Sequence, residues 1–241
     1  MALLEVRGIS KSFRGLRAVR DASFEIPEGD INGLIGPNGA GKTTIFNMIA
    51  GVYAPDSGSI VFNGAEIQGL RPDQICAAGI GRTFQIVKPF AGLTVLDNVM
   101  VGAFLHTRAA ADARTLAAEI VERLGLGPKR DLPASSLTLP DRKRLEVARA
   151  LATRPKLLLL DEVMAGLRPT ECDQMVEVFR ELNRKYGTTI LLIEHVMRAV
   201  MALAKHIGVL HHGEVIARGT PEQVVRDPAV LECYLGEETV V

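Results

Sequence analysis

The sequence predicts an α/β fold with a parallel-sheet core, an N-terminal antiparallel β-subdomain and an inserted α-helical subdomain. Short β-type runs separated by turn signals fill residues 3–64, and a helical pattern covers about 82–152. Over 156–194, an apolar run, a helical segment and a second apolar run follow one another. Strand, helix and strand in this order form the unit that builds parallel sheets.

We expect one domain over residues 1–241. In this division 1–84 and 153–241 form the core with its antiparallel β-subdomain, and 85–152 form the helical subdomain. The length suits one large domain that carries a smaller subdomain.

The composition is that of a soluble globular protein, with 28 Lys and Arg, 28 Asp and Glu, and 47% hydrophobic residues. The apolar content is too high for a disordered chain, and no apolar run approaches the about 20 residues that a membrane-spanning helix needs. We therefore expect no direct membrane span. A balanced charge also argues against nucleic acid as a partner, because such binding relies on clustered Lys and Arg.

Cysteine usage and the N-terminus add two expectations. Cys76, Cys172 and Cys233 lie far apart and match no zinc or redox spacing, so we expect reduced thiols without a metal or disulfide. The first residues lack a basic region followed by a long apolar run, so they predict a strand rather than a secretory signal.

The N-terminal part contains four β-type runs, which we interpret as antiparallel strands, and a helix that stops at Gly51. The runs are Leu3–Ile9, Ala22–Ile26, Ile31–Ile35 and Ser59–Phe62, and the helix is Lys42–Ala50.

The middle part predicts three helices, and the last carries Leu145, Ala148 and Leu151 on one face. The basic run 142–144 on the same helix is interpreted as a solvated face. The helices are Val95–Leu105, Arg114–Leu124 and Asp141–Leu151.

In the C-terminal part, a helix that ends at Gly187 separates two buried strands. Two short strands around His212-Gly213 and a closing helix that starts at Thr220-Pro221-Glu222 follow. The buried strands are Lys156–Asp161 and Thr188–Glu194, and the helix is Pro169–Tyr186.

A complete GxxxxGK[ST] motif lies directly between the strand Ile31–Ile35 and a helix. Glycines let the backbone N–H groups and the helix N-terminus surround phosphate oxygens. Lys42 is expected to reach the β- and γ-phosphates, and the Thr43 hydroxyl to bind Mg²⁺, so ATP and Mg²⁺ are the expected cofactors. The predicted phosphate-binding residues are Gly36, Pro37, Asn38, Gly39, Ala40, Gly41, Lys42, Thr43 and Thr44.

A second motif ends a buried strand in two acids, Asp161 and Glu162. Asp161 is expected to hold Mg²⁺ through water, and Glu162 to polarise an attacking water, which typically contributes about 10²–10⁴ in rate. An ordinary acidic turn would explain this pair alone. The phosphate loop upstream favours the catalytic interpretation.

With these motifs, the sequence resembles the ATPase subunits of ABC transporters over essentially the whole chain. The match extends to Phe13, Gln85 and His195. The resemblance implies that Phe13 stacks on adenine, and that Gln85 contacts Mg²⁺ or the attacking water beside the membrane subunits. It also implies that His195 contacts the γ-phosphate and, with Lys42, stabilises developing charge.

Four segments look most like the branched-chain amino acid uptake ATPases within that family. They are residues 79–85, 93–99, 165–167 and 234–237.

The family signature, Leu-Ser-Gly-Gly-Gln or a close relative, reads here Leu137-Thr138-Leu139-Pro140-Asp141. Thr138 keeps a hydroxyl for the phosphate bound to the opposite subunit, but Pro140 has no backbone N–H and Asp141 adds negative charge. Arg168 and Val163 also depart from the usual Asp or Asn and Pro. A proline and an acid suit an ordinary helix start as well, so weakened catalysis and tolerated variation both stay open.

The resemblance implies an ATP-hydrolysing subunit that energises an ABC transporter, an importer of branched-chain amino acids or similar small solutes, by ATP-driven dimer closure. The implied partners are transmembrane permease subunits and a second ATPase chain, identical or different. They would hold this chain on the cytoplasmic face of the membrane. Alternatives are a soluble ABC-type ATPase acting on nucleic acid or ribosomes, a small-molecule kinase and a low-turnover regulatory nucleotide-binding module.

Overall fold

The computed structural model describes residues 2–85 and 88–235, and its strands form two sheets. A four-stranded antiparallel sheet has the order β2-β1-β4-β5, and a six-stranded sheet has the order β10-β9-β3-β8-β7-β6. This mixed architecture confirms the predicted fold class. The first sheet contains Ala2–Phe13 (β1), Leu16–Pro27 (β2), Ser57–Phe62 (β4) and Ala65–Glu66 (β5). The second contains Ile31–Ile35 (β3), Ile80–Arg82 (β6), Leu157–Asp161 (β7), Thr189–Ile193 (β8), His206–His211 (β9) and Glu214–Gly219 (β10).

Strand β3 corrects one sequence-based interpretation. It was grouped with the antiparallel strands, but it pairs in parallel with both β8 and β9. Every residue of β3 is buried, because both faces of its sheet are covered. A continuous buried run is typical of such a central strand, whereas a half-exposed antiparallel strand would alternate.

Strands β7 and β8 divide their side chains between two hydrophobic cores. Leu157 and Leu159 pack with the antiparallel sheet and α1 (Lys42–Ile49), whereas Leu158 and Leu160 pack with α3 (Val95–Ala103) and the helices after it. Residues 190–193 of β8 alternate in the same way. The two-residue period of a strand with both faces covered explains why these runs are apolar throughout.

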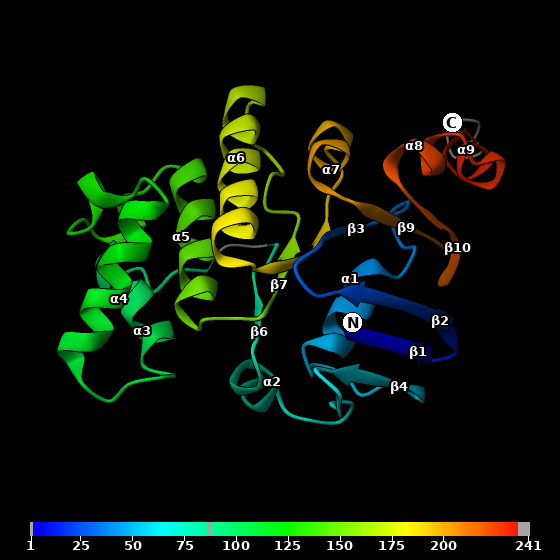
Figure 1. Ribbon diagram of the computed structural model, residues 1–241, viewed down its shortest axis with the longest axis horizontal. Coiled ribbons are helices and arrows are strands. Elements are labelled where there is room, and N and C mark those ends of the chain that lie inside the picture. The colour runs from blue at the N-terminus through cyan, green and yellow to red at the C-terminus, as the bar shows by residue number, and fades with distance from the viewer. Residues whose placement is uncertain (1, 86–87, 236–241) are drawn as a thin grey trace.

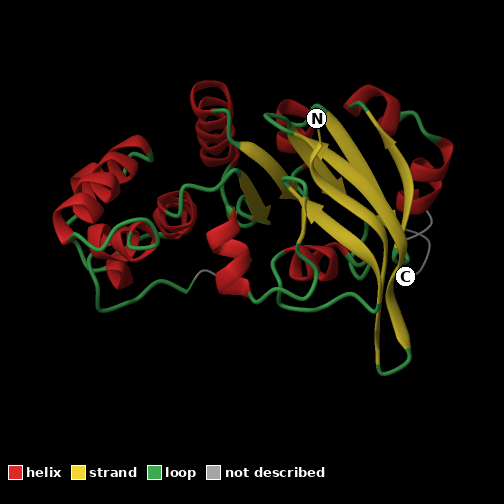
Figure 2. Ribbon diagram, turned by 60° about the horizontal axis from the view of Figure 1, so that its bottom comes forward, coloured by secondary structure: helices red, strands yellow, loops and turns green. Residues whose placement is uncertain are grey.

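Helices α3 to α5 lie between β6 and β7 in the sequence and gather at one end of the molecule, as Figure 1 and Figure 2 show. In Figure 1 the strands lie in the middle of the molecule and toward its other end, where α8 and α9 also lie. The boundaries proposed for the helical subdomain, residues 85 and 152, stay a prediction. The α-helices are Lys42–Ile49 (α1), Pro72–Ala78 (α2), Val95–Ala103 (α3), Ala110–Arg123 (α4), Leu139–Ala152 (α5), Pro169–Tyr186 (α6), Met197–Leu203 (α7), Pro221–Val225 (α8) and Pro228–Leu235 (α9). Two short 3₁₀ helices are Gly127–Lys129 and Ala134–Ser136.

The helix bounds show where sequence patterns are weak. Helix α6 has the predicted bounds, and Gly187 ends it at φ +63°. Helix α4 starts four residues before the predicted Arg114, because its alanine-rich first turn favours helix without burying much surface. The expected closing helix is two helices, since Pro228 cannot continue α8 and instead starts α9.

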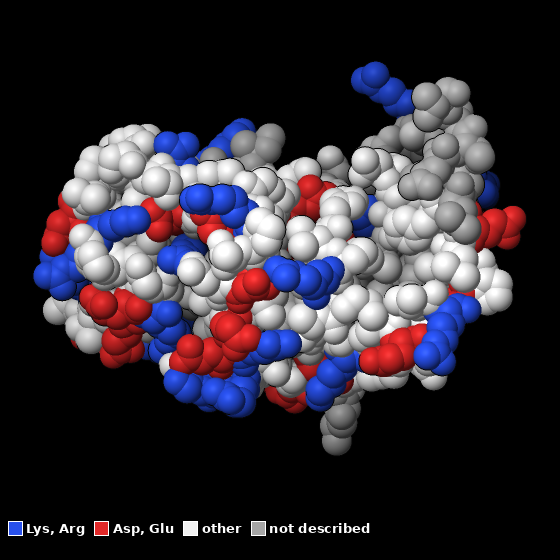
Figure 3. All heavy atoms as spheres, turned by 90° about the horizontal axis from the view of Figure 1, so that it is seen from above, with Lys and Arg blue, Asp and Glu red and all other residues white. Residues whose placement is uncertain are grey.

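Acidic and basic side chains are interspersed over the face that Figure 3 shows. Among the described residues, every helix is too short or too polar to cross a membrane.

Candidate nucleotide site

The predicted phosphate loop connects β3 to α1, and its glycines are required by close contacts. Gly36 and Gly41 have φ +146° and +104°. A Cβ at Gly36 would lie 2.0 Å from the Leu210 carbonyl oxygen, and one at Gly41 would lie 2.3 Å from the Ala18 carbonyl oxygen. The loop can therefore approach neighbouring backbone only where the side chain is a hydrogen atom.

Helix α1 begins directly after this loop with Lys42-Thr43-Thr44, so its first turn carries no acid. The positive end of the helix is left for an anion. The Lys42 ammonium is buried and donates to the carbonyl oxygens of Gly36 at 2.6 Å and Pro37 at 2.8 Å. It thus lies within the loop that is predicted to enclose phosphates.

Three residues predicted to be catalytic converge although the sequence separates them widely. The Glu162 carboxylate accepts a hydrogen bond from Gln85 Nε2 at 2.6 Å, and His195 Nε2 lies 3.0 Å from its other oxygen. Glu162 and His195 follow the carboxyl ends of β7 and β8, and Gln85 follows β6. Parallel strands bring such positions to one edge of the sheet, where α/β proteins bind ligands.

Asp161 ends β7 and is almost fully buried. Its Oδ2 pairs with Arg82 Nη2 at 3.0 Å, and Arg82 Nη1 donates to Asn47 Oδ1 at 2.6 Å. Burial raises the pKa of Asp161, although Arg82 opposes this shift. Arg82 lies within the segment 79–85, for which the sequence predicts a role only at Gln85, and it is the ion-pair partner of the predicted metal ligand Asp161.

The predicted Mg²⁺ ligands Thr43, Gln85 and Asp161 line one cavity. Within the described part of the chain, Asp161 Oδ1 is buried without a hydrogen-bond partner. A hydroxyl, an amide oxygen and a free carboxylate oxygen are hard ligands of the kind that Mg²⁺ prefers. The residues present therefore fit this ion.

Two buried charges beside the site escaped the sequence analysis. Lys143 is only 4% exposed, so the basic run 142–144 is not a uniformly solvated face as expected. Glu194 is 2% exposed, and its Oε1 accepts from the Met164 N–H at 2.8 Å. Burial raises the pKa of Glu194 from 4.5 to about 7. The sequence signal for this buried residue was its position directly after a buried strand and next to His195.

Phe13 ends β1 with an exposed ring that meets Tyr53 edge-on, with 5.1 Å between the ring centroids. Its predicted contact with adenine stays a prediction.

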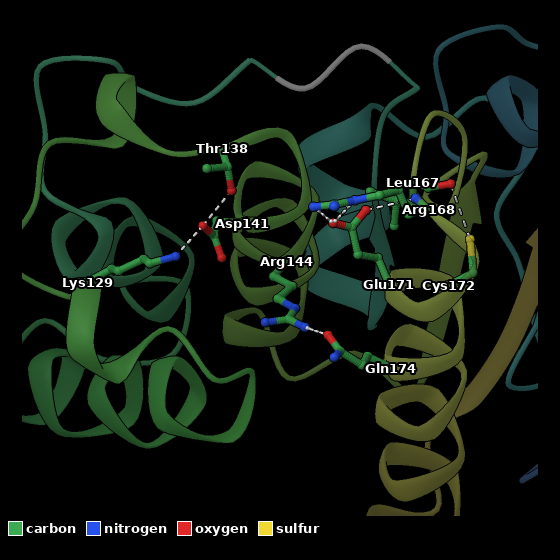
Figure 4. Close-up of polar contacts among 9 residues, drawn as sticks. All are labelled: Lys129, Thr138, Asp141, Arg144, Leu167, Arg168, Glu171, Cys172 and Gln174. Carbon is green, nitrogen blue, oxygen red and sulfur yellow. Dashed lines mark hydrogen bonds and ion pairs between the residues drawn. The ribbon is translucent and has the colours of Figure 1, made fainter.

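The segment Leu137–Asp141, which differs from the family signature, leads into α5. Thr138 is the N-cap of this helix and Pro140 is its second residue. Figure 4 shows Thr138 and Lys129 converging on Asp141. Its Oδ2 accepts from the Thr138 hydroxyl at 2.6 Å and from Lys129 Nζ at 2.5 Å. Burial acts to raise the pKa of Asp141, but these two hydrogen bonds, together with the positive charges of Lys129 and Arg144, outweigh it and lower the pKa. The hydroxyl predicted to bind a phosphate is thus already bound to an ionised carboxylate.

Arg168, also drawn in Figure 4, caps α6. Its backbone N–H donates to Glu171 Oε2 at 2.8 Å, and its Nε donates to Glu171 Oε1 at 3.1 Å. This unusual residue therefore has a local structural role at the start of a helix.

Known proteins resemble this chain along nearly its whole length. The profile described as "ABC transporter" matches residues 19–165, and one described as "Branched-chain amino acid ATP-binding cassette transporter" matches residues 214–240. The high-affinity branched-chain amino acid transport ATP-binding protein LivG of Salmonella typhimurium is 43% identical over 98% of both chains. The corresponding protein BraF of Pseudomonas aeruginosa is 39% identical, also over 98% of both.

The solved structures agree with this relationship. The ADP conformation of MJ1267, an ATP-binding cassette of an ABC transporter, superimposes with a TM-score of 0.88 at 32% identity over 98% of this chain and 99% of that chain. These matches favour the transport ATPase over the soluble ATPase, kinase and regulatory alternatives. The chain carries the phosphate loop, brings Gln85 and His195 onto Glu162, and resembles known ATP-binding subunits over nearly its whole length. It therefore belongs to the ABC transporter family as an ATP-binding, ATP-hydrolysing subunit.

Proposed function

We propose that this chain powers an importer of branched-chain amino acids or similar small solutes. The observation that carries the proposal is the match of residues 214–240 to the branched-chain amino acid profile, far from the motifs shared by all ABC ATPases. The chain would lie on the cytoplasmic face of the membrane, bound to permease subunits, and would close on a second ATPase subunit when ATP binds. Its solute would be selected by those other subunits.

The arrangement around Glu162 supports a role for this residue as the general base for hydrolysis. Its carboxylate oxygens are oriented by Gln85 and His195, so a water beside them would meet an aligned acceptor. Lys42 and the N-terminus of α1 would stabilise charge on the γ-phosphate. Thr43, Gln85 and Asp161 would hold Mg²⁺, which supplies neutralisation of phosphate charge.

The α5 N-terminus supports an asymmetric pair with a different ATPase subunit. This chain would supply its phosphate loop, Glu162 and His195 to one composite site, whose signature comes from the partner. Its own segment Leu137–Asp141 would complete the other site weakly, because Asp141 binds the Thr138 hydroxyl and Pro140 lacks an N–H.

Transport is tested by uptake of labelled leucine, isoleucine and valine into vesicles that hold this chain, the permease subunits and the binding protein. We expect ATP-dependent uptake that stops with Glu162→Gln, while ATP binding persists and the closed dimer accumulates. Hydrolysis near the wild-type rate in Glu162→Gln would refute the catalytic assignment. Uptake of an unrelated solute alone would refute the branched-chain assignment.

Asymmetry is tested by ATPase rates of the purified chain alone and with its partner ATPase. We expect low activity alone, an increase with the partner, and a further increase in the assembled transporter with Pro140→Gly combined with Asp141→Gln. Full activity of the chain alone, unaffected by these substitutions, would contradict the asymmetric pair.

A further inference from the structure

Lys143 is a buried cation that has no role among the residues proposed to bind or hydrolyse ATP. It lies in the first turns of α5 and is only 4% exposed. Removing an ammonium from water is unfavourable unless hydrogen bonds and nearby charges compensate it. Its neighbours Arg142 and Arg144 are half-buried and bind elsewhere, the former to the Ser135 carbonyl and the latter to Gln174 Oε1.

Among the described residues, Lys143 donates to the backbone of two predicted site residues. Its Nζ donates to the carbonyl oxygen of Glu162 at 3.0 Å and to that of Gln85 at 3.3 Å. These carbonyls follow two neighbouring strands, β7 and β6, whereas Lys143 comes from α5. One ammonium thus joins the helical region to two strand ends at the site.

Glu162 needs such support because its backbone is strained. It has φ +50°, a left-handed conformation that non-glycine residues rarely adopt. Its N–H donates to the Ile193 carbonyl at 2.9 Å, and its side chain contacts Gln85 and His195. Its carbonyl oxygen accepts from Lys143 Nζ at 3.0 Å and from the Ala165 N–H at 3.3 Å. The Lys143 contact is the shorter of the two and the one that ties the peptide plane after Glu162 to α5.

We propose that Lys143 is a positioning residue for ATP hydrolysis. Its hydrogen bonds fix the backbone of Glu162 relative to that of Gln85. Because Lys143 belongs to α5, the position of α5 then determines this arrangement. This inference rests on the proposed role of Glu162 as the general base. Because an error of about 1 Å in a catalytic group can cost roughly 10²-fold in rate, loss of the tie should lower kcat and leave ATP binding largely intact.

The experiment compares Lys143→Met, which keeps the length of the side chain without its donors, with Lys143→Arg, which keeps both charge and donors. All variants are measured in the assembled transporter. Arg144→Met removes a neighbouring cation on the same helix, and Lys185→Met removes a surface lysine of α6. The readouts are kcat, KM for ATP, affinity for a fluorescent ATP analogue and the melting temperature.

We expect Lys143→Met to lower kcat by roughly 10- to 100-fold, with KM and analogue affinity within about twofold of wild type. Lys143→Arg should recover most of the rate, and the two control variants should stay near wild type. A kcat for Lys143→Met within twofold of wild type would overturn the proposal. An equal loss in Arg144→Met would overturn it as well, because general charge on α5 would then explain the effect.

A double mutant separates positioning from a purely structural role. In the Glu162→Gln background the base is already removed, so Lys143→Met should lower the residual rate little further. An undiminished additional loss would contradict the proposal. If Lys143→Met does not fold, Lys143→Gln is judged by the same criteria. If Glu162→Gln alone leaves hydrolysis near wild type, the proposed function itself fails, whatever Lys143 does.

Discussion

Helices α1 and α5 both begin at segments predicted to bind phosphate, but their N-termini are built in opposite ways. The first turn of α1 follows Gly41 and carries no acid, whereas α5 follows Thr138 and carries Pro140 and Asp141. In α5 the chain supplies its own anion, and that anion already binds Thr138 and Lys129. The start of α1 therefore leaves its positive end to a ligand, whereas the start of α5 already carries a carboxylate of its own.

The largest effect on nucleotide binding should come from closing the α1 end. Gly36→Ala would place a methyl group 2.0 Å from the Leu210 carbonyl oxygen, which must displace the loop. We expect ATP affinity, measured with a fluorescent analogue, to fall by roughly 10²-fold or more because the phosphate-binding geometry is lost.

Gly39→Ala is the matched control. It also has a positive φ, +79°, but its Cβ would enter open space among the described residues. It should cost about 1 kcal/mol of folding stability, and its loss of ATP affinity should be well below that of Gly36→Ala. Equal losses in both variants would show that backbone strain, and not the close approach, governs the loop.

A second effect tests the buried ion pair at the strand ends. Arg82→Met would leave the Asp161 carboxylate buried without its guanidinium partner. We expect the free energy of unfolding, from urea titration, to fall by about 3–5 kcal/mol. If Arg82→Met unfolds at the wild-type urea concentration, Asp161 must be solvated or paired in another way.

A third effect is pH-dependent and also belongs to the strand ends. Burial raises the pKa of Glu194 from 4.5 to about 7, so the folded state retains a proton that the unfolded state releases. The free energy of unfolding should therefore fall as the pH rises from about 4.5 to 7, and this group should lower it by about 3 kcal/mol at pH 7.

Glu194→Gln removes this titration and keeps the shape of the side chain. We expect it to be more stable than wild type above pH 7 and similar to it near pH 4.5, with urea midpoints measured across this range. An unchanged difference at all pH values would contradict the assigned cause.

The smallest effect should come from the ion pair at α5. Lys129 is 41% exposed, so water screens its pairing with Asp141. We expect Lys129→Met to cost about 1 kcal/mol or less in urea titration, well below the cost of Arg82→Met. A larger cost than Arg82→Met would show that the start of α5 is the more tightly held of the two regions.

The sequence predicted the fold well where patterns were local. The phosphate loop, the two acids at the end of β7 and the bounds of α6 needed no tertiary information. The parallel pairing of β3 was missed, because a run buried on both faces carries no alternation. Helices α2 and α7 and strand β6 were missed because each is at most seven residues long and presents little periodicity.

The sequence motifs predicted the residues of the site, but not the residues that hold them in position. Glu162 was predicted from its motif, and Gln85 and His195 from the family resemblance. The structure brings the three side chains together, although their catalytic roles stay predictions. Lys143 and Glu194 escaped notice because their burial depends on elements distant in the sequence. Arg82 escaped notice because Asp161, with which it forms an ion pair, lies on another strand. A lysine in a basic run is expected to be exposed to solvent unless the tertiary structure shows that it packs against other elements, as Lys143 does at the ends of β6 and β7.

The alternating side chains of β7 and β8 have a consequence for cooperativity. The two hydrophobic cores share these strands, with Leu157 on one side and Leu158 on the other. Neither core can lose its packing without exposing a face of the same two strands, so local melting of one core is coupled to the other. A chain with two cores should therefore unfold in a single transition, with calorimetric and spectroscopic midpoints that coincide.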